Sequence, residues 1–368
     1  MATITETKTP KIVAELDQIR QMSVEELSES RSAELLNSRL GVKRTNGFRL
    51  GEQAKAWIAL IPALFFLIVF MIYPILNTFI MSWIENFSWV GGSGSSFALT
   101  NYFAALANSR LTTKPTWGIG NYTTVLFDTQ FLEALGNTAL MVIVSVPLTI
   151  IVALLIAVLL NSIKPLRGFF QTVFFLPYVT NTIALGMVFR VIFSSQPGGL
   201  FNTLMSWFGI GTQAWLTASA NRWNMFFVIV VYAIWNGLAF KILVFESGLA
   251  SIDKQYYDAA KIDGATRGTI FRRITVPLLG PELLYITITS FIGAFKAYSQ
   301  IISLFGGGAY AFGGSDDTEW MTVVGYIYKV MQDPTKVGRA AAGSFVLLVI
   351  ILIITLIQLM TYKKRSVR

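Results

Sequence analysis

The sequence predicts an all-α polytopic membrane protein with six transmembrane helices. Hydrophobic residues make up 54% of its 368 residues, and the mean hydropathy of +0.59 is that of a chain with several membrane spans. Six apolar runs each supply the roughly 20 residues that a helix needs to cross a bilayer. Aromatic residues such as Trp57, Trp83, Trp223 and Tyr362 lie near the ends of these runs, where interfacial side chains are favoured.

The chain supplies these runs in order, separated by polar connections. The expected spans are approximately Trp57–Trp83, Ala134–Leu160, Phe169–Phe193, Trp223–Leu249, Leu278–Ile302 and Arg339–Tyr362. Prolines inside the runs predict kinks, because each one frees a backbone carbonyl that a neighbouring helix has to satisfy. The prolines concerned are Pro62, Pro74, Pro147 and Pro177.

Composition excludes several classes of function. The chain contains no cysteine and no histidine, so thiol chemistry, disulfides and the commonest general base and metal ligand are absent. We find no phosphate-binding loop of the Gly-x-x-x-x-Gly-Lys-Ser/Thr type and no paired carboxylates inside the spans. We therefore expect no catalytic residues, no metal site, no bound cofactor and no enzyme activity of its own. The net charge of +9 is distributed as in a membrane protein, which argues against a nucleic-acid partner.

Basic residues set the expected orientation. Lysine and arginine are concentrated in residues 1–55, in the connection 254–273 and after residue 362, whereas the alternate connections hold few. By the positive-inside rule, both termini and the 254–273 connection are cytoplasmic. The predicted organisation is a cytoplasmic N-terminal tail (1–55), a transmembrane domain (56–362) and a short cytoplasmic C-terminal tail (363–368). The N-terminal tail either packs on a partner or is a loosely ordered extension.

The segment Leu249–Pro281 is a polar, basic stretch between two apolar runs. Its helical spacing predicts two short helices with a bend at Gly264, the second ending at Pro277. Small residues at Ala259, Ala260 and Gly264 permit close approach by another backbone. The residues alone leave two interpretations: an ordinary cytoplasmic loop, or a projection that another subunit grips.

This segment resembles the cytoplasmic loop motif of permeases from binding-protein-dependent ABC importers. The motif is carried here by Asp258, Ala259, Ala260, Asp263, Gly264, Ile274 and Pro277. The longer pattern of sugar permeases of the maltose and glycerol-3-phosphate type is matched almost throughout. One residue departs from it, because the leading glutamate of the motif is the shorter Asp258. The resemblance implies the type I ABC importer permease fold, with residues 250–277 forming the coupling helices of a sugar permease.

The same resemblance implies a set of partners. It predicts two copies of an ABC ATPase subunit, a second homologous permease subunit, an extracytoplasmic solute-binding protein and the lipid bilayer. ATP and Mg²⁺ would be used by the partner subunits rather than bound by this chain. The connections 84–133 and 305–338 would be external, with 305–338 contacting the binding protein. The complex would lie in the cytoplasmic (inner) membrane of a bacterium or archaeon.

Sugar contacts can be carried over from maltose-type permeases only by position. The matching residues are Asn236, Gly237, Phe240, Ser290, Gly293, Ala294 and Ala297. Most of these side chains differ from the maltose pattern, so maltose itself is not indicated. Trp235, Phe240, Phe295 and Tyr298 supply aromatic faces nearby, as sugar sites require. The alternative is that these positions serve helix packing, with an internal Lys241–Glu246 pair.

The sequence thus predicts transmembrane transport of a sugar or oligosaccharide. A polyol or glycerophosphodiester importer is a second interpretation within the family. An ion-coupled secondary transporter would need internal repeats and midplane carboxylates, of which Glu246 is the one candidate. A purely structural scaffold would leave the coupling motif unexplained.

Overall fold

The computed structural model describes residues 52–87, 99–100, 102–103, 114–163, 167–217, 219–305 and 320–366. The chain divides into a first unit, Met1–Val69, and a second unit, Phe70–Arg368. The predicted N-terminal tail therefore lies almost wholly outside the described residues. In the segment predicted as the short C-terminal tail, the helix α19 continues to Ser366.

The first apolar run is helical from Gln53 to Ser82. It consists of α3 (Glu52–Leu67), the π-helical turn η1 (Ile68–Ile72) and α4 (Tyr73–Ser82). Pro74 lies at the start of α4 and has no N–H to donate to the preceding turn. A widened turn just before such a proline is an expected response, because its ring also crowds the carbonyl four residues earlier.

Three further helices are long and apolar enough to cross a membrane: α7 (Thr129–Ser162), α11 (Arg222–Ser251) and α19 (Val337–Ser366). Two bent pairs supply more apolar length. α8 (Arg167–Val179) and α9 (Thr182–Ile192) meet at 101°, and the helical stretch Arg267–Leu278 meets α15 (Gly280–Phe295) at 67°. The described chain therefore has four straight spans, or up to six if each bent pair is one span, which agrees with the predicted all-α fold.

Two expected spans differ in detail from the structure. The run Phe169–Phe193 is broken at Thr180, whose amide donates to the carbonyl of Leu176, and Asn181 caps the new helix by accepting from the amide of Ile183. The run Leu278–Ile302 also stops early, because α15 ends at Phe295 and a separate helix, α16 (Ser299–Phe305), follows. Hydropathy reports apolar length and does not distinguish a continuous helix from a broken one.

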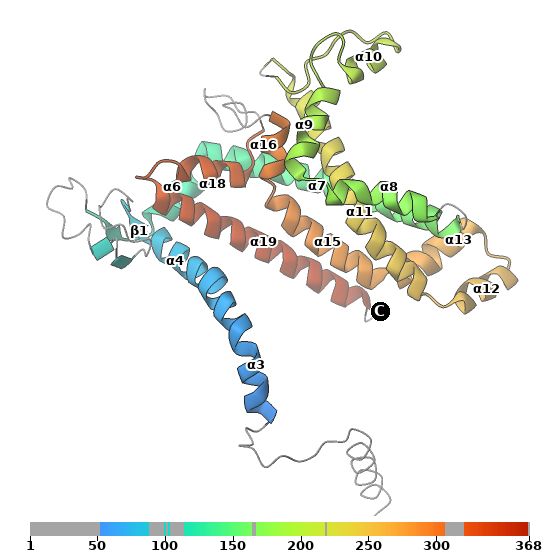
Figure 1. Ribbon diagram of the computed structural model, residues 1–368, viewed down its shortest axis with the longest axis horizontal. Coiled ribbons are helices and arrows are strands. Elements are labelled where there is room, and N and C mark those ends of the chain that lie inside the picture. Colours follow the sequence, from blue (N-terminus) through green and yellow to red (C-terminus); the bar gives the residue numbers. More distant parts are fainter. Residues whose placement is uncertain are drawn as a thin grey trace, which may run out of the picture. The chain divides into compact units, whose positions relative to one another are not determined.

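In the second unit, α7 is the central helix, packing along α11 and α15, while α19 packs on α15 and α4 (Figure 1). The buried core has three parts, the smallest of which surrounds Ile84 and Phe87 where α4 and β1 (Ile84–Glu85) meet α19. Of the two larger parts, one surrounds Phe131, Tyr232 and Tyr326, and the other surrounds Phe245 and Leu279. Short elements lie around the helices: β1 paired antiparallel with β2 (Thr116–Trp117), α6 (Gly120–Leu126), α10 (Leu200–Ser206) and α18 (Val323–Met331).

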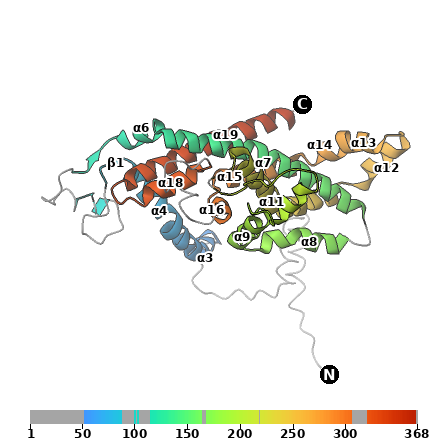
Figure 2. The same ribbon diagram turned by 90° about the horizontal axis from the view of Figure 1, so that it is seen from above.

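The polar segment after α11 folds into α12 (Lys254–Ile262), α13 (Arg267–Ile270), the π turn η3 (Phe271–Thr275) and α14 (Val276–Leu278). These elements lie at one end of the second unit, whereas β1 and α6 lie at the other (Figure 2). The prediction of two short helices separated by a bend is confirmed, although the second helix continues to Leu278, one residue past Pro277.

Candidate coupling site and translocation path

The predicted coupling segment, residues 250–277, begins with a capped helix. Asp253 precedes α12, and its side chain accepts a hydrogen bond of 3.0 Å from the amide of Gln255. Asp258, the leading acidic residue of the motif, forms an ion pair of 2.9 Å with Lys261. Both side chains are about two-thirds exposed, at 64% and 66%. An exposed pair of this kind contributes only about 0–1 kcal/mol, so a basic group on another protein can displace Lys261 at little cost.

Gly264 forms the bend between the two helices. Its φ of +72° is in the left-handed region, which side-chain-bearing residues adopt only at a cost. The amide of Gly264 donates to the carbonyl of Lys261, and that of Ala265 donates to the carbonyl of Ala260. This pair of bonds is a Schellman cap, in which glycine is the preferred residue. Thr266 then caps α13 through the amide of Thr269, so the chain turns within two residues.

The second half of the segment is anchored to the transmembrane helices. The hydroxyl groups of Tyr257 and Thr275 lie 3.4 Å apart and link α12 to η3. Leu279 is fully buried, and Phe271 and Val276 pack against the same core. A displacement of this segment would therefore pass directly to α7, α11 and α15, whose buried side chains form the rest of that core.

The outer surface of the segment carries both charged and apolar residues. Ala260 is buried, while Ala259, Asp263 and Pro277 are exposed and Ile274 is half-buried. Ile262 is 87% exposed and Tyr256 is 56% exposed, which is unusual for large apolar side chains. The sequence analysis gave Ile262 no role. Its position directly before the motif's Asp263 and Gly264 was the available signal.

Two ionisable residues of α11 have partners that differ from the Lys241–Glu246 pair considered from the sequence. The ammonium of Lys241 donates to the carbonyl of Gly237 at 3.1 Å. Glu246 is buried and accepts a hydrogen bond of 2.7 Å from Gln171 on α8. A Cβ at Gly237 would lie 2.9 Å from the nitrogen of Lys241 and 3.2 Å from a methyl group of Thr149. Gly237 therefore makes room for Lys241 to fold back along the helix.

Six of the seven residues predicted to contact sugar lie on α11 and α15, which the structure brings together, and Ala297 lies just after α15. Asn236, Gly237 and Phe240 are half-buried on α11, and the rings of Phe240 and Tyr285 on α15 are 6.3 Å apart. Of the remaining positions, Ser290 and Ala294 are half-buried, Gly293 is exposed and Ala297 is buried, with its carbonyl accepting from Thr322.

Aromatic side chains near this face separate into exposed and buried sets. Phe295 is 4% exposed and belongs to the core, whereas Trp235 is 38% exposed. Phe240 lies between two tyrosines that the sequence analysis did not identify, Tyr178 on α8 and Tyr285 on α15. No sequence pattern could pair them, because they come from three different helices.

A buried polar network joins helices at the opposite end of the second unit. Asn137 on α7 accepts a bond of 2.6 Å from Arg222 and donates one of 3.3 Å to the carbonyl of Met321. The guanidinium of Arg222 lies 5.2 Å from the ring centre of Trp320, whose indole N–H donates to the carbonyl of Arg222. These bonds connect the residues just before α18 to the starts of α7 and α11.

Asp128 forms a second part of this network. One carboxylate oxygen caps α7 through the amide of Gln130, and the other accepts a bond of 2.7 Å from the hydroxyl of Tyr326 on α18. Arg339 on α19 lies 3.9 Å from the same oxygen. Burial raises the pKa of the Tyr326 hydroxyl, and the adjacent Asp128 raises it further. The tyrosine is thus held as a neutral donor to a carboxylate.

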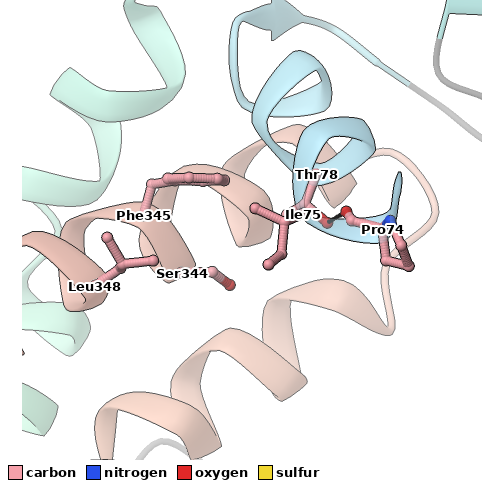
Figure 3. A pocket seen from close by; sticks show the side chains of 6 residues that line it. All are labelled: Pro74, Ile75, Thr78, Ser344, Phe345 and Leu348. Carbon is pink, nitrogen blue, oxygen red and sulfur yellow. Dashed lines mark hydrogen bonds between the residues drawn. The ribbon is translucent and has the colours of Figure 1, made fainter. Parts of the chain in front are cut away.

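An apolar groove of about 230 Å³ lies between α4 and α19 (Figure 3). Its lining residues are Pro74, Ile75, Thr78, Ser344, Phe345 and Leu348. Both hydroxyl groups are already bonded within their own helices, Thr78 to the carbonyl of Pro74 and Ser344 to that of Ala340. The groove therefore offers no free hydroxyl for recognising a polar solute and is unsuited to a sugar.

Several apolar helices and a projecting, glycine-hinged pair of short helices are the features of a polytopic membrane protein. Comparison with known families agrees. Residues 145–367 match the family described as "Binding-protein-dependent transport system inner membrane component". The chain belongs to this family. It is a membrane-embedded permease subunit of an ABC importer, and permease subunits of this kind have no ATPase site of their own.

Similar curated proteins are named as permeases for sugars. The chain is 35% identical over 245 residues to an arabinooligosaccharides transport system permease protein of Halalkalibacterium halodurans, covering 66% of this chain and 74% of that protein. It is 31% identical to the protein of the same name from Bacillus subtilis, covering 84% and 88%. A lactose transport system permease protein of Rhizobium radiobacter is 29% identical, covering 84% and 94%.

Solved structures share the fold. A chain of the bacterial alginate ABC transporter, in complex with an alginate pentasaccharide-bound periplasmic protein, superposes with a TM-score of 0.65 at 20% identity, covering 82% of this chain and 92% of that chain. The predicted type I ABC importer permease fold is therefore confirmed.

Proposed function

We propose that this permease subunit imports a sugar, most naturally an oligosaccharide, that an extracytoplasmic binding protein delivers. A second, homologous permease subunit completes the translocation path. Two ABC ATPase subunits bind and hydrolyse ATP with Mg²⁺, and this chain binds neither. Support for the substrate class comes from the relatives named for arabinooligosaccharides and lactose. Further support comes from half-buried polar and aromatic residues on the facing helices α11 and α15.

The observation that carries the coupling role is the geometry at Gly264. A capped helix, α12, presents exposed Asp258, Ala259 and Ile262, and it is joined through a tight glycine turn to a second helix rooted in the transmembrane core. Such an element can be held by a partner at one end and can push transmembrane helices at the other. Coupling segment and both termini would then lie on the cytoplasmic face.

Because the chain contains no cysteine, a single introduced cysteine can be labelled without a competing thiol on the same chain. A single cysteine is introduced at Ile262 on α12, and its control is a cysteine at Phe127, which is 82% exposed at the other end of the unit. A cross-linker with a maleimide at one end and a photoreactive diazirine, which inserts into any nearby side chain, at the other end is then applied to native membranes. We expect Ile262→Cys to cross-link to a P-loop ATPase identified by mass spectrometry, and Phe127→Cys not to do so. Equal cross-linking at both positions, or at neither, contradicts the docking role.

The energy source and substrate are tested in proteoliposomes that contain the full complex and the binding protein. Labelled arabino-, galacto- and malto-oligosaccharides are supplied outside, with ATP inside. We expect uptake of at least one of them that requires ATP and persists when ion gradients are collapsed. Uptake that follows an ion gradient without ATP would replace the importer with a secondary transporter.

A further inference from the structure

The connection between α9 and α11, Phe193–Asn221, contains α10 and has an ordered interior; we call it the α10 loop. Asn202 holds it together. Its side-chain amide donates to three backbone carbonyls of the loop at 3.1–3.2 Å. Its side-chain oxygen accepts from the amide of Gln213 and from the indole N–H of Trp215, which is buried. The loop therefore satisfies much of its own backbone and keeps a defined shape.

The outer surface of the α10 loop is apolar and uncharged. Trp207 and Phe208, just after α10, are 75% and 77% exposed, and Leu200 and Leu204 on α10 are also exposed. The chain has no charged residue from Val191 to Asn221. Large exposed apolar side chains gathered on an ordered, uncharged loop indicate an interaction surface rather than a solvated connection.

The hydroxyl groups of α10 add little polarity to this surface. Thr203 donates to the carbonyl of Gly199, and Ser206 donates to that of Thr203. At the same end of the second unit, the turn after α18 instead carries the partly exposed ion pair of Asp333 and Lys336. A soluble protein partner contacts surfaces with a polar, solvated rim, which the α18 turn offers and the α10 loop does not.

The α10 loop lies at the level of the membrane, on the side away from the coupling helices. Helix α8 has 13 residues and rises about 20 Å, compared with ~30 Å for the hydrocarbon layer. The chain then bends by 101°, so α9 gains little further height along the direction of α8. The loop ends at Arg222, which is bonded to the start of α7 and to Trp320. In Figure 1, α10 lies beyond the end of α9, away from α7 and α19.

We infer that the α10 loop is a membrane anchor, in which Trp207 and Phe208 enter the headgroup region of the phospholipid leaflet far from the coupling helices. Tryptophan is enriched in that region, because its ring is mostly apolar and its N–H finds polar partners there. Arg190, in the last turn of α9, is exposed and forms no ion pair within the described residues. Its guanidinium suits the phosphate groups of the same lipids.

The anchor has a consequence for the broken span. Helix α9 packs on α16, and it is joined to α8 only through the bend at Thr180. A loop fixed in the headgroup region would hold α9 at one height in the bilayer while α8 and α11 move. The inference concerns lipid contact and does not depend on which solute is transported.

The test measures lipid contact directly in the complete importer. A single cysteine at Phe208 is labelled with an environment-sensitive fluorophore, and the complex is placed in vesicles of phosphatidylethanolamine and phosphatidylglycerol. Some of the lipids carry a quenching spin label, either near the headgroup or near the end of the acyl chain. The matched control is Gln332→Cys, an exposed position at the end of α18. The complex with the cysteine-free chain gives the background from the other subunits.

We expect quenching at Phe208→Cys to be at least about twofold stronger than at Gln332→Cys, and stronger with the headgroup-level label than with the chain-end label. Trp207→Cys gives a second position and should behave in the same way, which covers the case in which Phe208→Cys fails to assemble. Quenching no stronger than at the control position overturns the anchor.

A cross-linking arm identifies the other occupants of this surface. The same cysteines are treated with the maleimide–diazirine reagent, with and without the binding protein. Under the anchor, the products are mainly lipid adducts in both conditions. Predominant cross-linking to the second permease subunit, or to the binding protein when it is present, would make the α10 loop a protein contact and overturn the inference. Neither result would alter the proposed transport of sugar.

Discussion

Polar residues are buried at one end of the second unit and exposed at the other. At the α18 end, Asn137, Thr138 and Asp128 are buried or nearly so and join segments almost 200 residues apart. At the coupling end, Asp258 and Lys261 pair within one helix and remain in solvent. The first arrangement resists any change in the spacing of helices, and the second leaves its charges available. The difference indicates a rigid frame at one end and an adaptable docking element at the other.

The largest effect on stability should come from removing the hydrogen bonds of Asn137 at the rigid end. Asn137→Ala removes a bond to the Arg222 guanidinium and another to the carbonyl of Met321. Because one bond involves a charged group, we expect a loss of about 2–4 kcal/mol in the free energy of unfolding. Thermal stability of the purified complex in detergent measures this change.

Thr149→Val is the matched control for Asn137→Ala. Thr149 is also buried on α7, but its hydroxyl bonds only to the carbonyl of Ser145 in the same helix. Its replacement keeps the side-chain shape and should change stability by less than about 1 kcal/mol. Equal losses in the two variants would show that the network between helices is not what stabilises this end.

Much of this fold could be predicted from the sequence. Apolar length located α7, α11 and α19, and the pattern around Gly264 located the two short helices α12 and α13, because both signals are local in sequence. The break at Thr180 could not be predicted, since apolar composition continues through it and the bend is set by the Asn181 cap. The rigid network was equally hidden: Asp128 and Tyr326 are 198 residues apart, and no periodicity connects them.

The candidate substrate path was predicted only in part. Resemblance supplied positions on α11 and α15, and the structure does bring those helices together at Phe240 and Tyr285. The contact between the rings of Tyr178 and Phe240 could not be predicted, because it depends on how α8 crosses α11. Of the Lys241–Glu246 pair considered from the sequence, Lys241 donates to the carbonyl of Gly237 and Glu246 accepts from Gln171.

The second effect is a loss of stability at high pH that depends on Tyr326. Burial and Asp128 raise the pKa of the Tyr326 hydroxyl in the folded protein above its unfolded value of about 10. The folded state therefore favours the neutral hydroxyl. The stability that this hydroxyl contributes is therefore complete below about pH 10 and is lost as the pH rises through the pKa of the folded state. Tyr326→Phe should cost about 1.5–3 kcal/mol near pH 8 and should flatten the alkaline part of the stability profile.

Stability of wild type and Tyr326→Phe measured from pH 8 to 11.5 tests this assignment. Parallel profiles for wild type and Tyr326→Phe would mean that another group titrates.

A smaller effect is expected at the hinge of the adaptable end. Gly264→Ala places a side chain at a φ of +72° and should cost about 1–2 kcal/mol locally. Gly268→Ala is its control, because Gly268 lies in α13 and a Cβ there would meet nothing within 4 Å. We expect Gly264→Ala to reduce substrate-stimulated ATPase activity of the complex and Gly268→Ala to leave it near wild type. Comparable losses of ATPase activity in both variants would mean that the glycine turn has no special role.

The smallest effect on stability should come from the exposed pair itself. A double-mutant cycle with Asp258→Asn and Lys261→Met should give a coupling energy of about 0–1 kcal/mol, since both side chains are about two-thirds exposed.

The two variants should nevertheless differ in function. If Asp258 serves the ATPase rather than Lys261, Asp258→Asn lowers substrate-stimulated hydrolysis, and Lys261→Met preserves or raises it by freeing the carboxylate. Equal losses in hydrolysis would instead mean that the pair acts as a unit to shape α12. A large coupling energy would mean that this end is as rigid as the other.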